Sequence, residues 1–148
     1  MQDDLPYRSH ERLQDYWNHL RKERPFPQES EIDPDEIADI WPSCFLISID
    51  DVTHRLGHRY SYLGDELVKA CGDDISNPDN ALRLLSMGSI PMMRKIDDVL
   101  KQKKLVIDAS DFINLKQLHI RYRTCMLPLG HKNGEVSHIL GCIHWQVC

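Results

Sequence analysis

The sequence predicts an α+β fold, in which an antiparallel sheet carries short helices on one face. Two short apolar strands, expected over 44–50 and 58–64, come before a helical region, and three longer strands follow it. The strand segments alternate between two sets of side chains, as in a sheet whose two faces have different surroundings. An amphipathic helix precedes the whole pattern.

Composition limits the classes of function. The chain has 148 residues, 41% hydrophobic and 28% charged, which is typical of one soluble globular domain. Its net charge of -5 disfavours nucleic-acid and anionic-membrane partners. We see no membrane span and no secretory signal. The five cysteines are odd in number and lack close pairing, so we expect a reducing, cytoplasmic location.

The leading helix is expected over 8–23, followed by a proline-marked connector and a short helix. The apolar stripe of the leading helix has the spacing i, i+3, i+4, i+7 and consists of Leu13, Tyr16, Trp17 and Leu20. In the short helix, Asp33 is a good N-cap and Pro34 suits the first turn. Pro42 ends this helix, which should therefore set where the first strand begins.

The middle of the chain predicts strands and short helices in turn. On the first strand Phe45 and Ile47 should share one face, and on the second strand Tyr60 and Tyr62 should do the same. A turn is expected over 50–57 between them. Short helices are expected at 65–71 and from Asn77, and a longer one at 91–104, with Met92, Met93 and Ile96 facing inward.

The last two strands allow a register to be predicted. A two-residue turn at Asn133-Gly134 would place these residues opposite each other: Tyr122 and Trp145, Thr124 and Ile143, Met126 and Gly141, Cys125 and Cys142, Leu127 and Leu140. Apolar side chains then meet apolar ones across the strands. A four-residue loop would shift the partners by two and keep the faces.

With this order of elements the chain resembles a PAS domain, in particular the compact single-domain PAS-like proteins common in alphaproteobacteria. The stretches that carry the resemblance are "IDPDEI", "WPSCFLISID", "RYSYLGDELVKACGDDI" and "LPLGHKNGEVSHILGCIHW". The resemblance implies a five-stranded antiparallel sheet in the order 2-1-5-4-3 and a sensing or protein-interaction role. We divide the chain into an N-terminal helix, 1–24, and a PAS-like domain, 25–148.

Histidine and cysteine residues raise the question of metal, redox and cofactor chemistry. His119, Cys125, Cys142 and His144 share a predicted sheet face, but alternation alone explains that, so we predict no metal site. Cys125 and Cys142 are better explained as buried thiols than as a redox pair. Residues 75–104 contain no histidine, which disfavours haem. Cys71 lies outside the Asn-Cys-Arg pattern of flavin-binding LOV domains, so flavin is disfavoured too.

No catalytic motif occurs, and we predict no enzyme. The inner face of the sheet could instead enclose a small apolar ligand, or its side chains could simply fill the core, which is the simpler interpretation. The candidate pocket residues are Phe45, Tyr60, Tyr62, Met92, Met93, Ile96, Tyr122 and Trp145.

The opposite face carries a leucine patch that needs a cover. The stripe of the leading helix could cover it, in its own chain or in a dimer mate. The interface candidates are Leu13, Tyr16, Trp17, Leu20, Leu127, Leu129 and Leu140.

The sequence therefore predicts a non-catalytic, stand-alone PAS-type sensory module. We expect it to be a homodimer that acts on another signalling protein and could bind a small molecule. The alternative is a pure interaction or adaptor protein with a filled core.

Overall fold

The computed structural model describes residues 4–49, 59–74, 76, 95–131 and 133–148. Its helices are α1 (Asp4–Arg21), α2 (Asp65–Ala70) and α4 (Lys95–Gln102), and its strands are β1 (Cys44–Ser48), β2 (Arg59–Leu63), β3 (Val106–Ile113), β4 (His119–Gly130) and β5 (Val136–Val147). The turn predicted over 50–57, the helix predicted from Asn77 and the start of the helix predicted over 91–104 lie outside the described residues.

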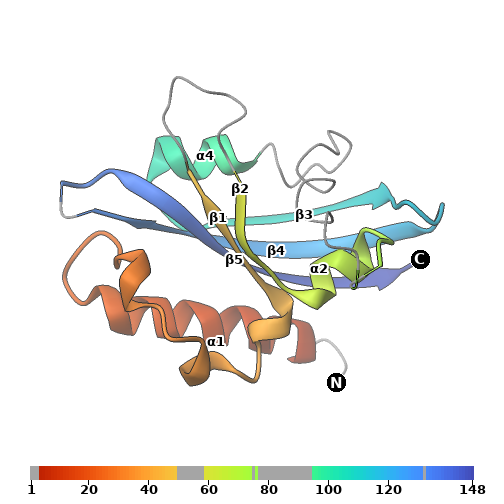
Figure 1. Ribbon diagram of the computed structural model, residues 1–148, viewed down its shortest axis with the longest axis horizontal. Helices are drawn as coiled ribbons and strands as arrows, with labels where there is room; N and C mark the ends of the chain where they lie inside the picture. The colour runs from red at the N-terminus through yellow and green to blue at the C-terminus, as the bar shows by residue number, and fades with distance from the viewer. Residues whose placement is uncertain (1–3, 50–58, 75, 77–94, 132) are drawn as a thin grey trace.

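The five strands form one sheet in the order β2-β1-β5-β4-β3, with every neighbouring pair antiparallel. The predicted fold class and strand order are therefore confirmed. Helix α1 runs along one face of the sheet, and α4 lies on the opposite face (Figure 1). We call the face that packs against α2 and α4 the inner face, and the face under α1 the outer face.

Each face of the sheet has its own buried apolar cluster. The inner cluster includes Phe45, Ile47, Tyr60, Leu67, Val68, Ile96, Val99, Tyr122, Met126 and Ile143. The outer cluster includes Leu13, Tyr16, Trp17, Ile37, Cys44, Leu46, Leu127, Leu129 and Leu140. The alternation along β1, β4 and β5 divides these side chains between the two clusters. Helices on both sides thus shield the centre of each face from water, whereas the outer face is exposed along β3, where Ile107 is 54% exposed.

The β4–β5 register agrees with the prediction, although the turn does not. The five predicted pairs, from Tyr122 opposite Trp145 to Leu127 opposite Leu140, all occur. The turn differs because Gly134 N–H donates to His131 O at 3.0 Å and Gly134 has φ 85°. This longer turn would shift the register by one residue. A bulge at Ser137 inserts one residue into β5 and restores it.

The predicted sharing of a face by Tyr60 and Tyr62 is wrong. Leu46 pairs with Tyr62 and Ile47 pairs with Tyr60, so Ser61 is an extra residue in β2. This bulge places Tyr60 on the inner face and Tyr62 on the outer face. There Tyr62 stacks on Trp41, with ring centroids 4.2 Å apart.

The segment that begins at Asp33 forms two 3-10 turns, η2 (Pro34–Ile37) and η3 (Trp41–Ser43), rather than the predicted helix. The predicted cap is present, since the Asp33 carboxylate accepts a hydrogen bond from Asp35 N–H at 3.0 Å. A proline in each turn leaves only short helical runs, for which 3-10 geometry is common. The segment still leads directly into β1.

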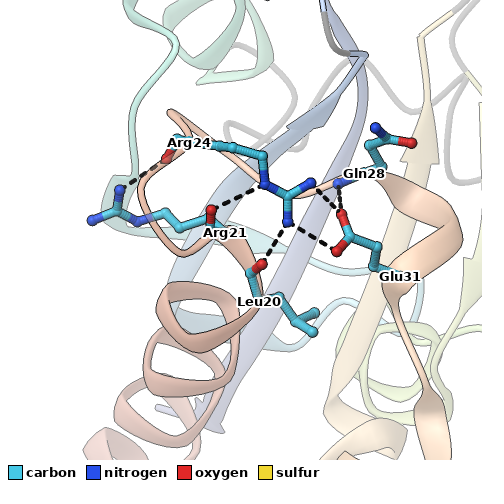
Figure 2. A network of polar contacts seen from close by, with 5 residues as sticks. All are labelled: Leu20, Arg21, Arg24, Gln28 and Glu31. Atoms are coloured by element: carbon cyan, nitrogen blue, oxygen red, sulfur yellow. Dashed lines mark hydrogen bonds and ion pairs between the residues drawn. The ribbon is translucent and has the colours of Figure 1, made fainter.

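Arg24 joins the end of α1 to the connector (Figure 2). Its guanidinium donates to two carbonyls of the helix end, Leu20 O at 2.6 Å and Arg21 O at 3.0 Å. Arg21 O also accepts from Arg24 N–H at 2.9 Å. It also binds both carboxylate oxygens of Glu31, at 2.7 and 2.9 Å. Glu31 in turn accepts from Gln28 N–H at 2.9 Å, which closes the turn η1 (Glu29–Glu31).

This network predicts an acid-dependent loss of stability. The hydrogen bond from Arg24 lowers the pKa of Glu31 from 4.5 to about 2. A lowered pKa in the folded state stabilises the protein above pH 4.5, and this contribution is lost as the pH falls toward 2. In Glu31→Gln we expect the urea midpoint to change less with pH over this range than in the wild type. If the urea midpoint of Glu31→Gln changed with pH as steeply as that of the wild type, the result would contradict this expectation.

Candidate functional site

The inner face brings together most of the predicted pocket residues. Phe45, Tyr60 and Tyr122 are buried there on β1, β2 and β4, and Ile96 reaches the same cluster from α4. Trp145 on β5 packs at the edge of the cluster and is partly exposed. Met92 and Met93 lie outside the described residues, and Tyr62 lies on the outer face.

Aromatic rings fill the centre of this face. Phe45 meets Tyr60 edge to face, with centroids 6.3 Å apart. The ring of Phe45 also covers Gly141, its partner across β1 and β5, where a Cβ would lie 2.1 Å from the ring. Glycine at position 141 therefore makes room for Phe45, and this part of the inner face is packed.

Toward β3 the inner face becomes polar. Tyr122 Oη donates to the Asp108 carboxylate at 3.3 Å. Thr124 pairs directly with Asp108 across the strands, and Trp145 pairs with Tyr122. Thr124 Oγ1 and Trp145 Nε1 are buried and have no hydrogen-bond partner. Two strands, β4 and β5, thus hold two unsatisfied polar atoms on one side of the sheet.

Thr124 and Asp108 are not among the pocket residues that the sequence predicts. The alternation predicts the face of Thr124 correctly, but threonine is an ordinary residue in a strand. A signal was present in the alternation, because Asp108 and Thr124 are polar residues on an otherwise apolar face. Burial also raises the pKa of the Tyr60 phenol, so this side chain is a neutral group at physiological pH.

The predicted interface residues meet within one chain. Leu13, Leu127, Leu129 and Leu140 are fully buried between α1 and the sheet, and Tyr16, Trp17 and Leu20 belong to the same cluster. Trp17 Nε1 donates to Pro128 O at 2.9 Å. Because the chain covers its own leucine patch, the alternative in which a dimer mate covers it does not describe this structure.

The residues considered for metal binding do not share one environment. Cys125 and Cys142 are buried on the outer face, whereas His119 is exposed and binds Asp111 at 2.8 Å. Within the described part of the chain, no group of three or more His, Cys, Asp or Glu side chains is arranged to hold a metal ion.

A hollow of about 180 Å³ lies away from the inner face. It is lined by Arg24, Pro25, Phe26, Gln28, His131, Asn133 and Gly134. The charged group in it, the Arg24 guanidinium, is already bound to Glu31 and to two carbonyls. This hollow is a weaker candidate for a ligand site than the polar part of the inner face.

Comparison with known families agrees with this architecture. The sequence model of the PAS domain family matches residues 6–144, nearly the whole chain. The chain belongs to the PAS domain family. The match begins within α1 and ends one residue before Trp145.

Solved structures show the same fold. The light state of the Aureochrome1 LOV photoreceptor has a TM-score of 0.53 at 10% identity, over 71% of this chain and 87% of that chain. The PAS domain of the fruit-fly ELK potassium channel has a TM-score of 0.51 at 14% identity, over 77% of this chain and 97% of that chain. At such low identity the likeness concerns the fold alone.

No curated protein sequence matches this PAS domain significantly. Among the described helices, none is both long enough and apolar enough to cross a membrane.

Proposed function

We propose that this PAS domain is a non-catalytic sensory module that binds a small, mainly apolar ligand at its inner face. The observation that supports this proposal is the pair of buried, unpaired atoms Thr124 Oγ1 and Trp145 Nε1. A buried polar group without a partner costs about 1–3 kcal/mol. A ligand that binds these atoms would remove that cost.

The two atoms also define what the ligand must offer. The indole N–H of Trp145 can only donate, so the ligand needs a hydrogen-bond acceptor near it. The hydroxyl of Thr124 can donate or accept. The aromatic and aliphatic side chains around them would contact an apolar body. Binding would shift the packing of the helices on the sheet, and another signalling protein would respond to that shift.

The alternative is an adaptor with a filled core and no ligand. The packing of Phe45 against Gly141 favours this alternative in the centre of the inner face. It leaves the unpaired atoms of Thr124 on β4 and Trp145 on β5 without a role, which is why we place the ligand beside them.

Native mass spectrometry of the chain isolated from the cells that produce it tests the proposal. We expect a bound mass that is lost on denaturation and that Thr124→Val and Trp145→Phe both reduce. Tyr62→Phe, which removes a hydroxyl from the outer face, is the matched control and should retain the bound mass.

An adaptor gives a different result with the same variants. Without a ligand, Thr124→Val removes an unsatisfied group and should raise the free energy of unfolding by about 1 kcal/mol. A bare chain that is stabilised by this substitution would contradict the sensor proposal.

We also propose that the protein is cytoplasmic and forms a homodimer. All five cysteines are free thiols, as is usual in a reducing compartment. Since α1 covers the leucine patch in one chain, the two copies would meet through other surfaces. Sedimentation analysis of the full chain would report the dimer.

A further inference from the structure

Three cysteines lie in one row across the outer face. Cys142 on β5 is directly opposite Cys44 on β1 and also directly opposite Cys125 on β4. All three side chains are fully buried in the outer cluster, which α1 and the connector that follows it cover. The row is on the opposite side of the sheet from Thr124 and Trp145, so it is independent of the proposed ligand site.

Backbone hydrogen bonds show that Cys44 and Cys142 form a non-hydrogen-bonded pair. Ile49 N–H donates to Ser137 O at 2.9 Å, so Ile49 and Ser137 are a hydrogen-bonded pair. Cys44 and Cys142 lie five positions further along the same two strands, an odd number. Hydrogen-bonded and non-hydrogen-bonded pairs alternate along antiparallel strands. In agreement, the carbonyl of Cys44 points away from β5 and accepts from Gly64 N–H on the other side, at 2.9 Å.

Cys125 and Cys142 form the other kind of pair. Cys148 N–H donates to His119 O at 2.9 Å, so these two residues are a hydrogen-bonded pair. Cys142 and Cys125 lie six positions along the same strands, an even number, so they are a hydrogen-bonded pair as well. The two neighbours of Cys142 are therefore not equivalent.

This difference favours one of the two pairs for a disulfide. Non-hydrogen-bonded pairs have Cα atoms about 4.5 Å apart and bring their side chains closer than hydrogen-bonded pairs do. Disulfides need Cα atoms roughly 4.4–6.8 Å apart and Cβ atoms close together. Cys44 and Cys142 therefore suit a disulfide with little movement of the strands, whereas Cys125 is the less favourable partner.

A buried histidine completes the arrangement. His10 on α1 is only 4% exposed, and its Nε2 atom is buried without a partner. The Cys44 thiol first, and then His10, lower the pKa of Cys142. Cys142 raises the pKa of Cys44, and the Cys44 thiol donates its proton to Ile40 O at 3.3 Å, so Cys142 is the sulfur that deprotonates first.

We propose that Cys44 and Cys142 are a redox pair that a hydroperoxide oxidises to an intrachain disulfide. The Cys142 sulfur attacks one peroxide oxygen, the O–O bond breaks, and the departing oxygen takes the thiol proton. The Cys44 sulfur then attacks the sulfenic sulfur, and the S–O bond breaks to release water with the proton of Cys44. The two sulfurs lose two electrons, and the peroxide gains them.

Helix α1 controls access to the pair. Cys142 is buried next to His10 of α1, so the peroxide reaches its sulfur when α1 moves off the sheet. A variant that loosens α1, such as Trp17→Ala, should therefore be oxidised several-fold faster than the wild type. The rate of oxidation would then depend on how often α1 leaves the sheet.

The test uses the full chain with Cys148→Ser, which removes the exposed thiol. After treatment with hydrogen peroxide, non-reducing mass spectrometry should show the loss of two hydrogen atoms, and peptide mapping should link Cys44 to Cys142. A dithiol reductant should restore the starting mass. Cys44→Ala and Cys142→Ala should each abolish the link.

Cys125→Ala is the matched control, because Cys125 is equally buried and also faces Cys142. It should leave the link intact. A link between Cys125 and Cys142, or oxygen addition without any link, would overturn the proposal. If either alanine variant does not fold, the peptide map of the Cys148→Ser protein alone still decides which sulfurs are joined.

Discussion

Replacing Trp17 by alanine is expected to lower the free energy of unfolding by about 3–5 kcal/mol. Trp17 is buried between α1 and the sheet. Its removal leaves a void that the strands cannot fill, because β4 and β5 are held by their neighbours on both sides. The indole also donates to Pro128 O at 2.9 Å, and the alanine variant leaves that buried carbonyl without this donor. Urea denaturation followed by circular dichroism would measure the change.

Trp17→Phe separates the two causes. It retains most of the apolar volume and loses only the N–H donor, so we expect a loss of about 1–2 kcal/mol. Asn18→Ala, at an exposed position on the same helix, controls for changes in α1 itself. If Trp17→Ala were as stable as Asn18→Ala, α1 would contribute little to the stability of the domain.

The alternation of apolar residues was sufficient to predict both faces of β1, β4 and β5. The stripe of Leu13, Tyr16 and Trp17 likewise predicted which side of α1 is buried. These predictions succeed because burial of apolar area is the largest favourable contribution to folding, and its period follows the backbone geometry.

The bulges could not be predicted in the same way. Ser61 and Ser137 are the extra residues of the two bulges. Serine is not a residue type that marks a bulge in a strand sequence. The first moved Tyr62 out of the predicted pocket. The second corrected the error in the predicted turn, so the register was right although its stated reason was wrong.

Long-range polar contacts were also hidden from the sequence. The amide of Asn114 donates to Ala70 O at 3.1 Å, which ties the turn after β3 to the end of α2. The same side chain accepts from Lys116 N–H and Leu118 N–H, at 2.9 and 3.0 Å. Asparagine is common in turns for local reasons, so its residue type does not reveal a distant partner. The unpaired atoms of the candidate site were hidden for the same reason.

Gly64→Ala is expected to destabilise the domain by about 3 kcal/mol or more, at the upper end of the range for overpacked sites. Gly64 has φ -69° and ψ 149°, a backbone conformation that any residue adopts. The need for glycine is therefore spatial. A Cβ at this position would lie 2.3 Å from Cys44 O and 2.4 Å from Pro42 O.

Both atoms that a methyl group would meet belong to the main chain, which cannot turn aside as a side chain can. The segment from Pro42 to Cys44 would have to move away from β2, and the hydrogen bond from Gly64 N–H to Cys44 O would be lost. Gly134→Asn is the control, since position 134 has open space around it and asparagine tolerates its φ of 85°. Thermal and urea unfolding should show a large loss for Gly64→Ala and little change for Gly134→Asn. Equal stability of the two variants would mean that β1 and η3 can separate from β2 at little cost.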